Sequence, residues 1–113
     1  MAKPKSATTR FANESERQFA EILDFYDVPW EYEARTFPLE VDEEGNVLEA
    51  FAPDFYLPDE DLYVELTTIK QSYVTRKHKK IRKLRERYPE VKNKLLNKRD
   101  YTNLAAKYDW KQS

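Results

Sequence analysis

Two acidic residues, Asp54 and Glu65, have a spacing that would bring their carboxylates face to face. The segment 53–67 predicts a β-hairpin whose turn centres on Asp59-Glu60, because apolar and polar residues alternate on either side of it. Pairing about this turn gives one wholly apolar side for a core and sets Asp54 directly across from Glu65 on the other side. The facing apolar pairs are Phe55 with Val64, Leu57 with Leu62, and Pro53 with Leu66.

Two directly opposed carboxylates repel each other, because their Cβ atoms lie only about 5 Å apart. Protonation of one carboxyl, an Arg or Lys between the two, or a bridging divalent cation would relieve the repulsion. Oxygen ligands alone favour Mg²⁺ or Mn²⁺, since the chain has no Cys and a single His. Glu16 could supply a third carboxylate if the first helix packs beside these strands, although three residues after Asn13 it also fits a capping box.

The elements that must position these residues follow from the apolar periodicity. Helical spacing of apolar residues, ended by Pro29, predicts a first helix over 14–27. Strands are expected over 30–37, with Pro38 at the end, over 47–57 after a turn at 42–46, and over 62–69. A basic helix over 74–88, a short strand over 91–96 and a last helix beginning at Asp100 complete the chain.

This order predicts one α/β domain over residues 13–113, preceded by a mobile N-terminal tail over 1–12. The expected sheet is mixed and four-stranded, with three antiparallel strands and the basic helix crossing over to a fourth strand. Helices flank the sheet.

Composition excludes several classes of function. A chain of 113 residues with one Gly has no glycine-rich phosphate loop, and the absence of Cys excludes disulfides and thiol nucleophiles. No apolar run approaches the roughly 20 residues of a membrane span, and the N-terminus has no secretory signal pattern. We therefore expect a cytoplasmic protein without a membrane partner.

The Pro53-Asp54 pair, ten intervening residues and then Glu65-Leu66-Thr67 resemble the signature of the PD-(D/E)XK nuclease superfamily. The element order is similar to the αβββαβ core of these restriction-endonuclease-like proteins, and the helix containing Glu16 resembles their first helix. The likeness is greatest to small members related to Holliday-junction resolvases, very-short-patch-repair endonucleases and transposon-end nucleases. It implies hydrolysis of DNA phosphodiester bonds, with Mg²⁺ held by Asp54, Glu65, Glu16 and the backbone carbonyl of Leu66.

The sequence departs from this signature at Thr67, where the family's pattern has a lysine. Either a lysine from elsewhere replaces it or the site is catalytically inactive. Lys70 is the first candidate, because the chain is expected to turn there, and Lys77 and Lys80 could reach back from the basic helix. Gln71 could add a polar contact.

The charges are separated along the chain. Residues 12–68 contain 17 acidic and two basic residues, whereas residues 69–100 contain 13 basic and three acidic residues. The basic helix therefore predicts contacts to a phosphate backbone without base readout. The expected contact residues are Arg76, Lys77, Lys79, Lys80 and Lys83.

The predicted function is a Mg²⁺- or Mn²⁺-dependent endonuclease acting on branched or duplex DNA. A homodimer is expected, because a domain of this size would need a second copy to cut two strands. Two alternatives remain: an inactive nuclease fold that only binds nucleic acid, and an interaction module whose acidic and basic faces pair in a homodimer. The basic helix could also be a solvated helix that pairs with the acidic half of its own chain.

Overall fold

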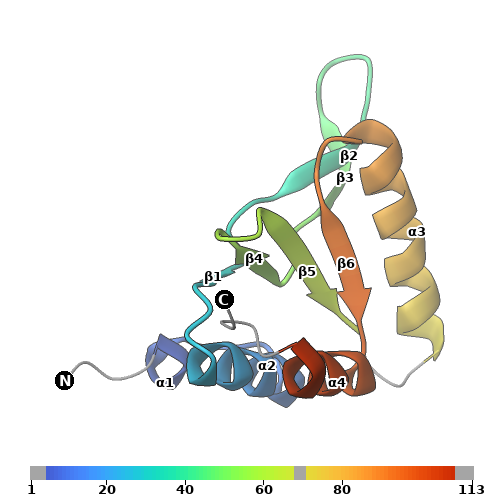
Figure 1. Cartoon of the computed structure of the whole chain (residues 1–113). Helices are drawn as coiled ribbons and strands as arrows, with labels where there is room; N and C mark the ends of the chain where they lie inside the picture. The colour runs from blue at the N-terminus through green and yellow to red at the C-terminus, as the bar shows by residue number, and fades with distance from the viewer. Residues whose placement is uncertain (1–4, 68–70, 109–113) are drawn as a thin grey trace.

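The computed structural model describes residues 5–67 and 71–108, which form helices and strands in an α/β arrangement (Figure 1). The prediction of an α/β fold with a mixed four-stranded sheet is confirmed. In chain order the elements are α1 Lys5–Thr8, α2 Glu14–Phe25, β1 Glu31–Tyr32, β2 Phe37–Val41, β3 Val47–Phe51, β4 Phe55–Leu57, β5 Leu62–Leu66, α3 Gln71–Arg87, β6 Asn93–Leu96 and α4 Lys98–Tyr108.

The main sheet has the strand order β1-β4-β5-β6. Strands β1, β4 and β5 are antiparallel, whereas β6 runs parallel to β5 after the chain crosses over through α3. Strands β4 and β5 pair Phe55 with Val64 and Leu57 with Leu62, so the predicted hairpin register is confirmed. This register fixes which side chains of β5 share a face with Glu65.

The predicted strand 47–57 is broken into β3 and β4, and the predicted strand 30–37 is replaced by the short β1 and by β2, which begins at Phe37 and continues to Val41. Strands β1 and β4 join the main sheet, and β2 and β3 form a separate two-stranded hairpin that projects from it (Figure 1). Glu33 has a positive φ of 48° at the break, and its N–H still donates to the Asp54 carbonyl at 2.9 Å. The expectation that Pro38 ends a strand is wrong, because Pro38 lies within β2 opposite Ala50. A two-stranded sheet has only edge strands, where a residue without an N–H is tolerated.

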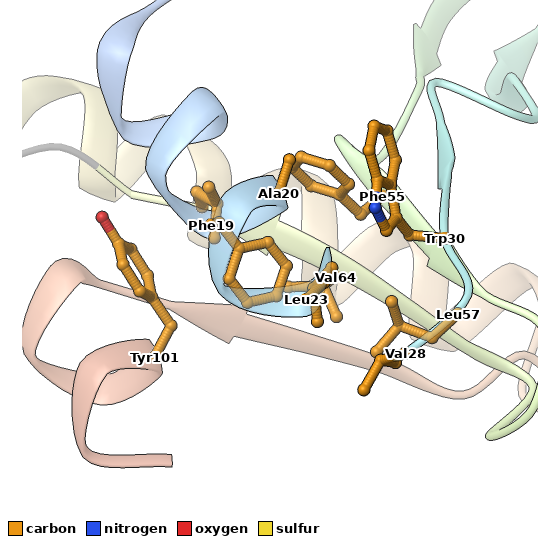
Figure 2. Close-up of a cluster of buried hydrophobic side chains, with 10 residues drawn as sticks. Phe19, Ala20, Leu23, Val28, Trp30, Phe55, Leu57, Val64 and Tyr101 are labelled. Atoms are coloured by element: carbon orange, nitrogen blue, oxygen red, sulfur yellow. The ribbon is translucent and has the colours of Figure 1, made fainter. Parts of the chain in front are cut away.

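One face of the sheet is covered by α2 and α4 through a large apolar cluster (Figure 2). Phe19 and Leu23 of α2 meet Phe55 and Val64 of the strands, and all four are fully buried. We call this group the α2-side cluster; its buried members are Phe19, Ala20, Leu23, Val28, Trp30, Phe55, Leu57, Val64, Leu66 and Tyr101.

Helix α3 covers the opposite face through a smaller cluster. The bend after β1 carries the β2–β3 hairpin over to α3, so that apolar residues of the hairpin pack on the apolar stripe of this helix. We call this group the α3-side cluster; its buried members are Phe37, Leu39, Phe51, Ile81 and Leu84. Because successive strand residues point to opposite faces, Val64 and Leu66 enter the α2-side cluster while Tyr63 packs against the α3-side cluster.

The structure describes residues from Lys5 on, whereas the sequence predicts that the domain begins at Asn13. Residues 5–8 of the expected tail form α1, where the Ser6 N–H donates to Asp24 Oδ2 at 3.0 Å and Lys5 Nζ donates to the Trp30 carbonyl at 2.5 Å. Residues 1–4 lie outside the described residues. Within the described part of the chain, no helix is long and apolar enough to cross a membrane.

Candidate active site

Asp54 and Glu65 meet at the end of the β4–β5 ladder, as predicted. The Asp54 N–H donates to Glu65 Oε1 at 3.0 Å, and the Leu66 N–H donates to Asp54 Oδ2 at 2.9 Å. Each carboxyl group is therefore fixed by a backbone donor of the neighbouring strand. Both side chains are buried, with 8% of Asp54 and 5% of Glu65 exposed.

This burial changes the protonation of the pair. The pKa of Asp54 is raised to about 8, chiefly by loss of hydration and also by the charge of Glu65, while the Leu66 N–H opposes the shift. Burial also raises the pKa of Glu65, and Lys77 counteracts it. Burial therefore favours protonation within the pair, whereas Lys77 favours the charged form of Glu65.

Lys77 of α3 is the cation that reaches this pair. Its Nζ lies 2.9 Å from Glu65 Oε2 and also donates a hydrogen bond to the Leu66 carbonyl. A neighbouring cation, one of the three ways to relieve the carboxylate repulsion, is thus present, and burial favours a second, protonation. As a replacement for the lysine of the signature, the sequence favours Lys70 first and Lys77 or Lys80 after it.

Thr67, which occupies the lysine position of the resembled signature, joins β5 to β6. Its N–H donates to the Leu96 carbonyl at 2.8 Å, and its hydroxyl lies 3.5 Å from the same oxygen. Lys70 lies outside the described residues. Gln71 is the first residue of α3, and its side chain is also outside the described part of the structure.

Glu16 is buried but has partners of its own. Its carboxylate accepts hydrogen bonds from the Tyr32 hydroxyl at 2.5 Å, from the Ala12 N–H at 3.1 Å and from the Asn13 side chain at 3.3 Å. The Glu16 N–H donates to Asn13 Oδ1 at 3.0 Å, which confirms Asn13 as the N-cap, but the Glu16 carboxylate accepts from the Ala12 N–H in place of the Asn13 N–H that a full capping box uses. The charge of Glu16 raises the pKa of Asp54.

The expectation of a three-carboxylate metal cluster is not met: in residues 5–67 and 71–108, no three acidic, His or Cys side chains stand close enough to hold an ion together. The capping interactions at the start of α2 explain where the Glu16 carboxylate is held instead.

A groove of about 250 Å³ opens beside Glu65; Asp54 is not among its lining residues. One wall belongs to β3 and the residue after it, and the other belongs to α3. The lining residues are Ala50, Phe51, Ala52, Glu65, Arg76, Lys77 and Lys80. The sequence had indicated the cations and Glu65, but not the β3 wall, because that wall depends on the bend between β2 and the main sheet.

The remaining predicted contact residues of α3 have different surroundings. Lys83 Nζ lies 2.7 Å from Glu40 Oε1 and 2.6 Å from Glu49 Oε1, which fastens α3 to the β2–β3 hairpin. The hydrogen bond from Lys83 lowers the pKa of Glu49. Lys79 is exposed. The acidic and basic halves of the chain thus meet within one molecule at Lys83.

Comparisons with known proteins give no match to a family model, to a curated protein or to a solved structure. The chemistry of the site therefore has to be judged from its own residues. Two carboxylates and the Leu66 carbonyl are hard oxygen donors of the kind that Mg²⁺ and Mn²⁺ prefer. The Lys77 ammonium already contacts two of these donors, which shows that they converge on a position that suits a cation.

Proposed function

We propose that this protein is a metal-dependent nuclease that hydrolyses phosphodiester bonds at the groove beside Asp54 and Glu65. The observation that carries the proposal is the buried Asp54–Glu65–Lys77 arrangement, with its carboxylates held by reciprocal backbone bonds. Burying two acids side by side costs stability, so a folded domain retains them most readily where they do chemistry. The resemblance of residues 53–67 to the nuclease signature supports the same conclusion.

Each residue has a role that follows from its position. Asp54, Glu65 and the Leu66 carbonyl would hold Mg²⁺ or Mn²⁺, which polarises a phosphate and lowers the pKa of a bound water. Asp54 must release its proton to act as a ligand. The Lys77 ammonium, freed from its two oxygens, would orient the attacking water or stabilise the charge that develops on the phosphate.

Cleavage assays test the proposal directly. Nicked, branched and single-stranded DNA, each incubated with Mg²⁺ or Mn²⁺, should be cut by the purified protein and spared in EDTA. Asp54→Asn and Lys77→Met should each lower the rate by about 10²-fold or more. Glu60→Gln, an exposed change in the turn of the same hairpin, is the matched control. Equal rates for Asp54→Asn and the control would refute the assignment.

A second candidate function is nucleic-acid binding without cleavage. It is favoured by one observation: the Lys77 ammonium bridges Glu65 and the Leu66 carbonyl, so a cation of the chain itself satisfies two of the donors. This candidate predicts salt-sensitive binding that is the same in Mg²⁺ and EDTA. DNA cleavage that requires metal and Asp54 would decide against it.

A further inference from the structure

The eight basic residues of α3 between Arg76 and Arg87 do not form a uniform surface. Three of them, Arg76, Lys77 and Lys80, line the groove together with Glu65. Lys83, one turn further along, is instead held between two glutamates of the β2–β3 hairpin. The cations that face the candidate active site therefore end at Lys80.

The length of this short cationic track can be stated. Residues 76 and 80 are four apart, which is about 6 Å along a helix axis. A nucleic-acid strand carries one phosphate per 3.4 Å of axis, so about 6 Å corresponds to about two phosphates of one strand. Among the described residues no carboxylate lies within ion-pair distance of Lys80, and the acid its charge influences is Glu49, whose pKa it lowers.

The opposite wall of the groove cannot serve a second strand in the same way. Ala50, Phe51 and Ala52 are uncharged, and the residue that precedes them, Glu49, is acidic. Glu40 lies across the hairpin from Glu49. Both carboxylates are already paired with Lys83. A duplex would therefore find cations for one of its strands only, while its other backbone would face an uncharged wall.

We propose that the groove is a binding site for one strand of nucleic acid, in which Arg76 and Lys80 neutralise about two adjacent phosphates next to the Lys77–Glu65 ion pair. Lys83 is not part of this site and serves to fasten the hairpin. The proposal rests on the proposed function and deepens it by naming a single strand, free or displaced, as the substrate class.

Equilibrium binding in EDTA tests this site without cleavage. A fluorescein-labelled 12-nucleotide single strand and a duplex of the same length are titrated with the protein at several salt concentrations. For the single strand we expect log K to fall with log salt at a slope of about −1.4, since about two phosphates are neutralised at roughly 0.7 each. Lys80→Ala should weaken binding about five- to tenfold, because it removes one charge-assisted contact. Lys83→Ala should change the affinity less than twofold.

The possible results separate this proposal from the nuclease assignment. A slope of about −5 or steeper, tighter binding of the duplex, or equal losses for Lys80→Ala and Lys83→Ala would overturn the groove, because the whole basic helix would then bind. Absence of binding would overturn it as well. Single-strand binding of the expected kind without cleavage would keep the groove and refute the nuclease, whereas cleavage that Lys80→Ala leaves unchanged would do the reverse.

Discussion

The two faces of β5 differ in what holds them. On one face, Val64 and Leu66 enter the α2-side cluster. In this cluster the rings of Phe19 and Phe55 meet edge to face, with their centroids 5.0 Å apart. On the other face, Glu65 lies between the Asp54 carboxyl and the Lys77 ammonium. One strand thus contributes to an apolar core and to a charged site, because its side chains alternate. The first face is stabilised because apolar area is removed from water. On the second face, the cost of burying charged groups is offset by the attraction between them.

The largest effect is expected on the apolar face. Phe55→Ala should lower the free energy of unfolding by about 3–5 kcal/mol, because Phe55 is fully buried and its removal leaves a cavity. Urea denaturation measures this loss. Phe25→Ala is the control: the side chain of Phe25 is 80% exposed, so the change should stay within about 0.5 kcal/mol. A comparable loss in both variants would show that the α2-side cluster is not the main source of stability.

The charged face should respond to loss of its cation. Lys77→Met leaves the Glu65 carboxylate buried without its partner, and we expect a loss of about 2 kcal/mol at pH 7. This value is below that of a fully buried pair, since 26% of the Lys77 side chain is exposed. At pH 4 the penalty should shrink, because protonated Glu65 no longer needs a cation.

Urea denaturation of Lys77→Met at the two pH values distinguishes charge from packing. Lys79→Met, an exposed change on the same helix, is the control. An equal loss at pH 4 and pH 7 would mean that Lys77 contributes through its aliphatic stem, and the contrast between the two faces of β5 would then be weaker than proposed.

The alternation that separates these faces is also what could be predicted from the sequence. The register of β4 and β5 follows from the apolar side formed by Phe55, Leu57 and Val64, since a slip of one residue would expose all of it. The opposition of Asp54 and Glu65 then follows without further information. The N-cap bond from the Glu16 N–H to Asn13 is equally local, and it too is present in the structure.

The features that were not predicted depend on contacts between distant segments. The break in the long hairpin is set by packing of Phe37 and Phe51 on Ile81 and Leu84, which no local pattern records. Lys77, and not Lys80, contacts Glu65 because of the rotation of α3 about its axis above β5. Prolines mark strand ends only in interior strands, so Pro38 was misleading in an edge hairpin.

The free energy of unfolding should depend on pH in a way that shows the ionised Asp54 carboxylate to be destabilising. Its pKa is about 8 in the folded protein, whereas the ordinary pKa of an aspartate is 3.8. Below about pH 3.8 both states bind the proton and the contribution to stability is complete. As the pH rises, the unfolded chain loses its proton first, so this contribution is lost progressively up to about pH 8 and does not change above it.

Asp54→Asn removes this dependence, because asparagine does not ionise. We therefore expect the variant to be more stable than the wild type at pH 8 by about 1–3 kcal/mol, with a difference that vanishes toward pH 4. Urea midpoints at pH 4, 6 and 8 test the trend. A variant that gains stability while losing cleavage would show that the acidic pair serves function. A variant less stable than the wild type at pH 8 would mean that the carboxyl is needed for folding.

The smallest effect is expected at Lys83, where the charges are exposed to solvent. Lys83→Ala removes two ion pairs to the β2–β3 hairpin, and it should lower the melting temperature slightly in low salt. The difference from the wild type should disappear in about 1 M NaCl, where the screening length is about 3 Å. Lys79→Ala, on the same helix, should show no such salt dependence. If the lower melting temperature of Lys83→Ala persists in high salt, then packing of the lysine stem, and not its charge, holds the hairpin on α3. This charged region would then be stabilised by burial of apolar atoms, as the α2-side cluster is.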